Sequence, residues 1–320
     1  VNYDYDNKYL LSLSIRRDES SKFHKDNRVG YFPSVSAGWN VHQEKWFQNP
    51  VMSKLKIRAS YGELGANFLN PYNFDAIAYG PIPYTVGGER YVTGRAAYLK
   101  SKDLKWETAK TTDIGIELGF FNNDLTLSLD YFVKKNVDLL AQIDLNLSSG
   151  QIFEINSSRE KPYVNTASVK NTGWEFMMNY RKQLTKDFHI DATFNIATLK
   201  NKVLSLGETV QPITSGAMSS YFNDAASITM PGEAIGSFYG YKIDGFDAEG
   251  NFIFADTDKN GVVNANDKVI LGSPIPDFTY GLNINMEYKD FDLTVFFQGV
   301  QGNDIFNQKK YTYYFDYSNN

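Results

Sequence analysis

Apolar and polar residues alternate with a period of two along most of this chain. In residues 125–131, every odd position is apolar and every even position is polar. This alternation is typical of a β-strand whose two faces meet different surroundings. It predicts nine strands, with part of a tenth at residues 1–5. The nine predicted strands are residues 9–16, 34–41, 55–61, 113–120, 125–131, 174–180, 188–196, 278–288 and 291–297.

The two faces of these predicted strands differ in charge. The apolar faces of the nine strands comprise 39 positions, and none of them is charged. Charged residues make up 22 % of the chain, so about eight or nine of 39 random positions would carry a charge. The opposite faces carry charged residues among Ser, Thr, Asn and Gly, namely Arg16, Lys56, Arg58, Asp113, Glu117, Asp130, Glu175, Asp191, Glu287 and Asp292.

The connections between the predicted strands alternate between short and long. Short turns lie near residues 6–8, 122–124, 181–187 and 289–290, and a turn of moderate length lies at 42–54. In an antiparallel sheet of consecutive strands, all short turns then lie at one end and all long connections at the other. Outer-membrane barrels have this arrangement, with short periplasmic turns and long extracellular loops. The long extracellular loops are predicted near residues 17–30, 62–112, 132–172, 197–277 and 299–320.

Together these features predict an all-β fold, part of an up-and-down antiparallel transmembrane β-barrel. A Lys or Arg that faces lipid at mid-membrane costs roughly 2–4 kcal/mol, which would explain the uncharged apolar faces. A soluble β-sandwich or β-repeat protein also alternates, and it remains the alternative. Aromatic residues cluster near the strand ends, where a girdle at the membrane interface would lie. These residues are Tyr9, Tyr61, Phe120, Tyr131, Trp174, Tyr180, Tyr288 and Phe291.

Length and composition narrow the function classes. The 320 residues are enough for two ordinary domains or for one large all-β unit. The absence of Cys excludes disulfides, zinc-thiolate sites and cysteine nucleophiles. No apolar run approaches the roughly 18 to 20 residues of a membrane helix, and a net charge of −5 with mixed signs gives no basic stripe for nucleic acid. The chain begins at Val1 and ends in polar residues, so we expect it to be an internal piece of a longer protein.

The sequence predicts no catalytic site. The three histidines, His24, His42 and His189, are far apart and form no H-x-x-x-H pair for zinc. There is no G-x-S-x-G motif, and the glycines near residues 87–94 lack a following G-K-[ST]. We therefore expect that the protein is not an enzyme, and no substrate-binding residues can be assigned.

One segment, DTDKNGVVNAND at residues 256–267, resembles the twelve-residue calcium loop of an EF-hand. Such a loop supplies hard oxygen ligands from positions 1, 3, 5, 7, 9 and 12, with a glycine at position 6 for the sharp turn. Gly261 occupies that sixth position. The spacing predicts a Ca²⁺ site made by Asp256, Asp258, Asn260, the Val262 carbonyl, Asn264 and Asp267.

The residues around this loop do not predict an EF-hand sensor. Residues 251–254 alternate like a short strand, and Pro274 and Pro276 disfavour a following helix. Asp267 also replaces the longer Glu that usually binds calcium through both oxygens. We expect any bound Ca²⁺ to be structural and to stiffen an extracellular loop. The alternative is an Asn-, Asp- and Gly-rich loop whose side chains cap its own backbone.

Several longer segments resemble the SusC/RagA family of TonB-linked outer-membrane proteins of Bacteroidetes. They span nearly the whole chain in the order found in that family. The most specific is DTDKNGVVNANDKVILGSPIPDFTYGLNINMEYKDFDLTVFFQGVQGNDIFN, at residues 256–307. The other resembling segments are residues 10–41, 53–67, 104–140, 169–181 and 232–247.

This resemblance implies an importer in the outer membrane of a Gram-negative cell. In that family, a 22-stranded barrel holds an N-terminal plug, and a SusD-like surface lipoprotein covers it as a lid. The pair captures oligosaccharides or peptides, and the TonB complex pulls on the plug to release them inward. The resemblance covers only the middle and later part of the barrel. We therefore expect the plug, the TonB box and the closing strands to lie outside residues 1–320.

Two other functions remain open at this point. The first is a β-rich surface or adhesion protein that does not transport and whose loops are stiffened by calcium. The second is a passive porin of the same architecture without a plug. A porin would conduct steadily in planar bilayers, whereas a plugged importer would be nearly silent.

Overall fold

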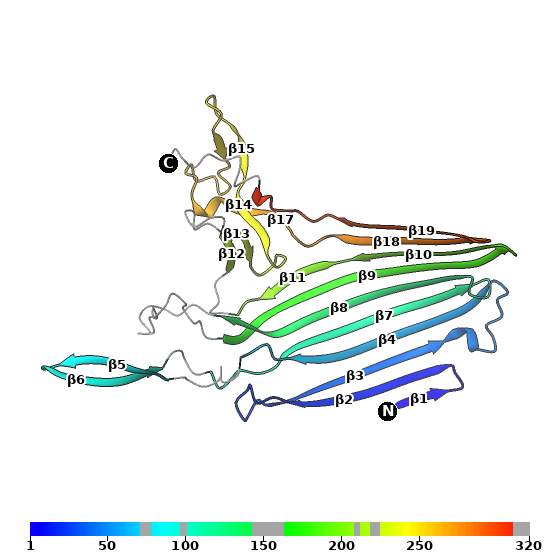
Figure 1. Ribbon diagram of the computed structural model, residues 1–320, viewed down its shortest axis with the longest axis horizontal. Helices are drawn as coiled ribbons and strands as arrows, with labels where there is room; N and C mark the ends of the chain where they lie inside the picture. The colour runs from blue at the N-terminus through cyan, green and yellow to red at the C-terminus, as the bar shows by residue number, and fades with distance from the viewer. Residues whose placement is uncertain (71–77, 97–100, 143–162, 208–211, 218–224, 310–320) are drawn as a thin grey trace.

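A computed structural model describes residues 1–70, 78–96, 101–142, 163–207, 212–217 and 225–309. Apart from turns and short 3₁₀ and helical segments, the regular structure in this part of the chain is β-strand (Figure 1). None of the helical segments described there has the length and apolar character needed to cross a membrane. The all-β fold predicted from the sequence is confirmed.

One large antiparallel sheet dominates the molecule. Ten of its strands pair in the order in which they occur along the chain, and an eleventh strand, β11, pairs with β9. All ten strands predicted from the alternation are present, which confirms the up-and-down arrangement. The ten strands are β1 (Asn2–Tyr5), β2 (Tyr9–Glu19), β3 (Val29–Asn40), β4 (Met52–Ala66), β7 (Glu107–Phe120), β8 (Leu125–Gln142), β9 (Tyr163–Thr185), β10 (Phe188–Thr198), β18 (Phe278–Tyr288) and β19 (Phe291–Gln301); β11 is Lys200–Ser205.

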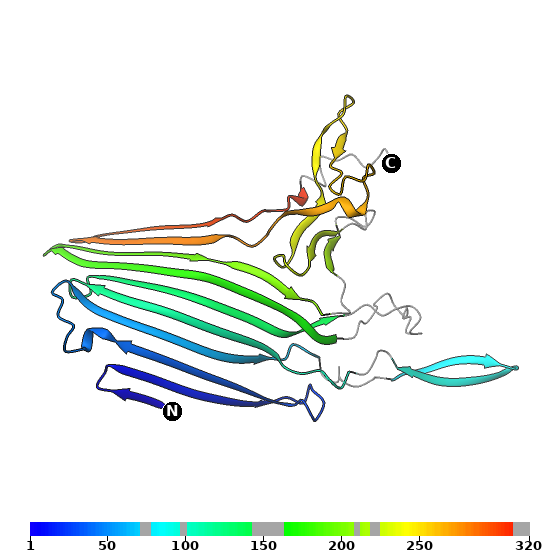
Figure 2. The same ribbon diagram turned by 180° about the vertical axis from the view of Figure 1, so that it is seen from behind.

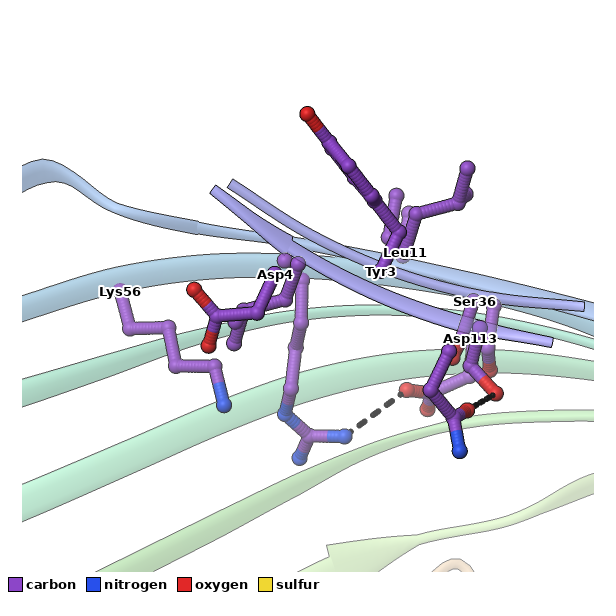
Figure 3. A pocket seen from close by; sticks show the side chains of 14 residues that line it. Tyr3, Asp4, Leu11, Ser36, Lys56 and Asp113 are labelled. Atoms are coloured by element: carbon purple, nitrogen blue, oxygen red, sulfur yellow. Dashed lines mark hydrogen bonds and ion pairs between the residues drawn. The ribbon is translucent and has the colours of Figure 1, made fainter. Parts of the chain in front are cut away.

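The strand register divides the sheet into an apolar face and a polar face. Ile57, Ile116, Leu129 and Phe176 lie opposite one another on four adjacent strands and define the apolar face. Successive side chains of a strand point to opposite sides of a sheet, so the residues that follow Ile57, Ile116 and Leu129 belong to the polar face. They are Arg58, Glu117 and Asp130. Figure 3 shows this division at the edge of the sheet: Tyr3 and Leu11 point to one side, and Lys56 and Asp113 point to the other.

The apolar face is not covered by other parts of the described chain. Ile57 is 41 % exposed and Leu129 is 39 % exposed, although both lie in the middle of long strands. The sheet is also open, because β1 and β19 lie at its two edges in the described residues and pair with no further strand there. A sheet with one apolar and one polar face is the arrangement of a barrel wall whose outer side meets lipid.

Tight turns connect the strands at one end of the sheet. Asp6 and Asn7 have positive φ angles of 53° and 56°, a conformation that Asn and Asp tolerate better than most residues. In the turn after β3, Glu44 accepts hydrogen bonds from the Tyr9 hydroxyl at 2.7 Å and from the Trp39 indole at 3.2 Å. The hydrogen bond from Tyr9 is the largest of the effects that lower the pKa of Glu44. Two of the aromatic residues near this end are thus held by the adjacent turn.

The long connections lie at the other end, and they contain more strand than the sequence predicted. Strands β8 and β9 continue to Gln142 and begin at Tyr163, deep within the predicted loop 132–172. The same holds for the ends of β2, β3, β4, β7 and β19, which extend into the predicted loops 17–30, 62–112 and 299–320. The strands extend past the apolar alternation because that alternation ends where the apolar face ends, whereas backbone hydrogen bonds continue between paired strands.

Two of the predicted loops also contain additional strands (Figures 1 and 2). In the predicted loop 62–112, β5 (Ala78–Val86) and β6 (Glu89–Ala96) form a hairpin. In the predicted loop 197–277, a small sheet and a second hairpin follow β11. The small sheet contains β12 (Ile213–Ala217), β13 (Ala225–Thr229), β14 (Ser237–Tyr241) and β17 (Lys268–Gly272); the hairpin contains β15 (Ile243–Phe246) and β16 (Phe252–Phe254).

Small hydrophobic cores hold these long connections together. Phe23, Leu69 and Leu104 are buried against each other, although they come from three separate stretches of chain. Trp106 packs on this cluster, and its indole donates a hydrogen bond of 3.1 Å to the Arg28 carbonyl. The parts of the long connections that carry Phe23, Leu69 and Leu104 therefore pack together at this end of the sheet.

Candidate functional site

An ion-pair network lies on the polar face of the sheet. The Arg58 guanidinium contacts Asp130 Oδ1 at 2.7 Å through Nη2 and Asp113 Oδ1 at 3.2 Å through Nη1. Its Nε lies 3.3 Å from Glu117 Oε1, and Lys54 Nζ lies 2.7 Å from Glu117 Oε2. Ion pairs this exposed to water contribute little individually, but Asp130 is 7 % exposed and needs a partner for its charge. The network thus holds the charged side chains of β4, β7 and β8 together on the polar face of the sheet.

The strand register explains how one arginine reaches across two strands. Arg58 on β4 lies opposite Gly115 on β7, and Gly115 lies opposite Asp130 on β8. A Cβ at Gly115 would overlap Asp130 Oδ1 and come within 3.1 Å of Arg58 Nε. Glycine at this position therefore leaves the space in which Arg58 and Asp130 meet.

The charged network borders a hollow on the polar face near the edge of the sheet. The hollow has a volume of about 580 Å³. Residues of β1 to β4 and β7 line it, with both polar and apolar side chains (Figure 3). The polar and charged side chains at its wall include Asn2, Asp4, Ser12, Ser36, Lys56 and Arg58. Such a surface can meet water, a polar ligand or another polar part of a protein.

The sequence placed Arg58, Asp113, Glu117 and Asp130 on the polar face but did not predict that they form one network. Their alternation within each strand shows only which way the side chains point. The network depends on the register between strands. The short turn at residues 121–124 sets the pairing of β7 with β8, and counting outward from that turn could have placed Gly115 opposite Asp130.

The structure brings together three carboxylates of the predicted calcium loop. Asp256, Asp258 and Asp267 each place an oxygen within 4.8 Å of the other two. Asp256 Oδ2 accepts a hydrogen bond of 2.7 Å from the Gly261 amide, whose φ is +87°. Only Gly adopts this φ freely, as expected for the sixth position of such a loop. The turn thus gathers the acidic side chains on one side.

Asp267 is the buried member of this cluster. It has no exposed surface, and its carboxylate accepts hydrogen bonds from the amides of Thr257 at 2.7 Å and Asn264 at 2.8 Å. The hydrogen bond from the Asn264 amide, the largest effect on this group, lowers the pKa of Asp267. The carboxylate is therefore ionised at neutral pH.

The other predicted ligands contact the backbone or side chains of the same loop. Asn260 Oδ1 accepts a hydrogen bond of 2.8 Å from the Val262 amide, and the Val262 carbonyl accepts one of 3.0 Å from Asn264 Nδ2. These are the contacts of a loop that caps its own backbone. They are also compatible with oxygen ligands gathered around a cation. The donor set fits Ca²⁺ in kind, with carboxylate, amide and carbonyl oxygens.

The segments that flank the loop are strands β16 and β17. The sequence predicted the first as a short strand and disfavoured a helix after the loop. Between them lies only a 3₁₀ turn at Ala265–Asp267, in which Asn264 and Asp267 form a capping box. A pair of helices flanks the loop of an EF-hand, and both are missing from the described residues on either side of this one. The loop is therefore not part of an EF-hand.

Comparison with known proteins identifies the class. The family of β-barrels of TonB-dependent receptor-like proteins matches residues 1–320, and the chain belongs to this family. The chain is 36 % identical over 325 residues to TonB-dependent receptor P3 of Formosa agariphila, covering 96 % of this chain and 32 % of that protein. It is 32 % identical over 329 residues to TonB-dependent receptor SusC of Bacteroides thetaiotaomicron, covering 96 % and 31 %. The resemblance to SusC and RagA found in the sequence is confirmed.

Solved structures show the same fold. The RagAB peptide transporter matches with a TM-score of 0.77 at 23 % identity, over 97 % of this chain and 34 % of the matched chain. The RagAB peptide importer in its open-open state matches with a TM-score of 0.78, also at 23 % identity, over 94 % and 32 %. The present chain therefore spans about a third of the length of the curated relatives and of these structures. Its open sheet is part of a TonB-dependent receptor barrel.

Proposed function

We propose that this chain is the barrel part of an importer in the outer membrane of a Gram-negative cell. The apolar face of the sheet carries this proposal, because it is uncharged, continuous and exposed in the described chain. Lipid would cover that face. The polar face, with the Arg58 network, would line the interior. Membership in the TonB-dependent receptor family supports import over the passive porin.

The proposed importer works with two partners. A SusD-like surface lipoprotein would cover the barrel on the extracellular side, where the packed long connections of this chain would lie. The TonB complex would act on a plug within the full protein. The similarity to SusC and to the two-component RagAB transporter supports this assignment. In this arrangement, the barrel is a scaffold and conduit, and energy enters through the plug.

Oligosaccharides or peptides are the proposed cargo. One similar structure is described as a peptide transporter, and its identity to this chain is 23 %. The hollow and the Arg58 network offer hydroxyl, amide and charged groups, which suit either kind of polar cargo. The proposal thus specifies the class of polar oligomers.

Uptake by cells tests this proposal. The gene of the full protein would be deleted, and uptake of fluorescent oligosaccharides and peptides would be followed with and without the gene and with and without TonB. We expect uptake of one class to need both the full protein and TonB. Uptake that needs the protein but not TonB would favour the porin. Normal uptake of every class after deletion, together with lost surface attachment, would favour the adhesin.

We also propose that the loop at residues 256–267 binds Ca²⁺ as a structural ion. The three gathered carboxylates and the buried, ionised Asp267 support this proposal. Asp256, Asp258, Asn260, the Val262 carbonyl, Asn264 and Asp267 are the proposed ligands. The ion would neutralise these carboxylates and hold together the segment between β16 and β17.

A further inference from the structure

A row of lysines crosses four neighbouring strands of the large sheet. Lys110 on β7 lies opposite Lys135 on β8, and Lys135 lies opposite Lys170 on β9. Lys170 in turn lies opposite Lys202 on β11. We call Lys110, Lys135, Lys170 and Lys202 the lysine row. Its members come from segments up to 92 positions apart in the sequence, so only the fold brings them into one line.

The lysine row lies on the same side of the sheet as the apolar face. On β8, Leu129, Tyr131 and Lys135 are separated by even numbers of residues, and pairing with β7 is regular between them. Side chains at such spacing point to the same side of a sheet. Trp174 and Lys170 on β9 have the same relation. The row therefore continues the apolar face and does not point toward the Arg58 network.

The distance along the strands places the row just beyond the apolar band. Tyr131 and Trp174 pack together with their ring centres 4.8 Å apart, where the aromatic girdle was predicted. Lys135 lies four residues beyond Tyr131, which is about 13 Å along a strand, toward the long connections. Val133 lies between them on β8, opposite Thr112 on β7 and Thr172 on β9, and all three face this side. In a barrel, polar headgroups begin at this level, beyond the aromatic girdle.

Among the described residues, most of the charge of the row has no carboxylate partner. Glu63 on β4 lies opposite Lys110 and forms an ion pair with it at 3.2 Å. Within the described residues, Lys135, Lys170 and Lys202 have no carboxylate at ion-pair distance. Like charges directly opposite each other on neighbouring strands destabilise a sheet. Three successive lysine pairs are thus unfavourable unless an anion lies against them.

We propose that the lysine row binds the phosphate groups of lipids in the outer leaflet of the membrane. This inference rests on the proposed function, which places the long connections outside the cell. In the proposed function, lipids cover the apolar face beside the row, so their phosphates would lie at the level of the ammonium groups. Each basic side chain near an anionic membrane surface increases binding about fivefold. A phosphorylated lipid would thereby fix the height of the barrel in the membrane.

Binding of a defined lipid to the full protein tests this inference. The delipidated protein would be titrated in neutral detergent micelles with diphosphoryl lipid A, with the dephosphorylated form of the same lipid, and with inorganic phosphate alone. The variant Lys135→Gln/Lys170→Gln/Lys202→Gln removes the three charges that have no carboxylate partner within the described residues. A matched control, Lys45→Gln/Lys186→Gln/Lys289→Gln, removes three charges from the turns at the opposite end of the sheet.

We expect the row variant to bind diphosphoryl lipid A about 100-fold more weakly and the control to differ less than twofold. Dephosphorylated lipid should bind the unaltered protein as weakly as the row variant binds the phosphorylated one. Replacing the same three lysines with arginine should preserve binding, which separates lost charge from a damaged fold. Equal binding by the row variant and the unaltered protein would overturn the inference. So would full competition by inorganic phosphate alone, because the row would then be a simple anion site.

The outcome can be separated from that of the proposed function. If the row variant still reaches the outer membrane and supports TonB-dependent uptake while lipid binding is unchanged, only the lysine-row inference fails. If the unaltered protein is not an outer-membrane protein, the proposed function fails first.

Discussion

At the scale of single residues, Gly115 lies between the paired charges of Arg58 and Asp130 on the polar face. Replacement with alanine would place a methyl group where Asp130 and Arg58 meet. Overpacking of this kind costs about 1–3 kcal/mol. We expect Gly115→Ala to lower the free energy of unfolding of the full protein by that amount, measured by urea denaturation in detergent. Gly38→Ala is the control, because its added Cβ would lie no closer than 3.4 Å to any atom. Equal stability of the two variants would show that the network tolerates the methyl group.

Because the pKa of Asp267 is lowered, the stability of the loop at residues 256–267 should depend on pH in acid. The pKa of Asp267 is lower in the folded loop than in the unfolded chain, where an Asp has a pKa of about 3.9. The ionised carboxylate therefore stabilises the folded loop fully above about pH 3.9, and this stabilisation is lost as the pH falls through the pKa of the folded state. Without calcium, protection of residues 256–267 from hydrogen exchange should stay constant from pH 6 to about pH 4 and then fall. Rates would be corrected for the intrinsic effect of pH. Asp267→Asn should show weaker protection without this dependence. An identical pH profile in the variant would assign the change to another group.

Calcium should stabilise the same loop. At a concentration 100-fold above its Kd, a ligand that binds only the folded form adds about 2.7 kcal/mol. We expect Ca²⁺ to slow hydrogen exchange in residues 256–267 and a chelator to reverse this effect. Asp258→Asn should greatly reduce the response. Asp247→Asn should leave it intact, since Asp247 caps a separate turn through Glu249 and Asn251. An unchanged exchange rate with calcium would favour the loop that only caps its own backbone.

At the scale of elements, the apolar face distinguishes a membrane barrel from a soluble sheet. Leu129 is 39 % exposed in the chain alone, so an arginine there would be tolerated in water. Facing lipid, it would cost roughly 2–4 kcal/mol. We expect Leu129→Arg to reduce the amount of folded full protein in the outer membrane, as judged by its heat-modifiable mobility in gels. Thr126→Arg, on the polar face of the same strand, should accumulate normally. Normal accumulation of both variants would contradict the assignment of the apolar face to lipid.

The alternation of residues was sufficient to predict ten of the eleven strands described in the large sheet, their order and their two faces. It did not predict that β8 and β9 continue beyond the apolar band, because apolar and polar residues no longer alternate regularly there. It also missed the Arg58 network and the lysine row, since both depend on the register between strands far apart in sequence. The grouping of Asp256, Asp258 and Asp267 was predictable because these carboxylates lie within twelve consecutive residues.

At the scale of the whole molecule, the open sheet is part of a larger barrel. Strands β1 and β19 leave two edges of the described sheet unpaired, and the relatives are about three times as long as this chain. An exposed edge invites pairing with further strands. In the full protein, we expect further strands of the same polypeptide to pair with these edges. The polar face would then enclose the conduit.

The most direct test of this account is the composition of the protein in its native membrane. The outer membrane would be extracted in mild detergent, and the protein that contains this sequence would be purified and analysed by mass spectrometry. The account predicts a chain several hundred residues longer that includes a plug and that purifies together with a surface lipoprotein. A 320-residue protein recovered from the soluble fraction without a partner would contradict it.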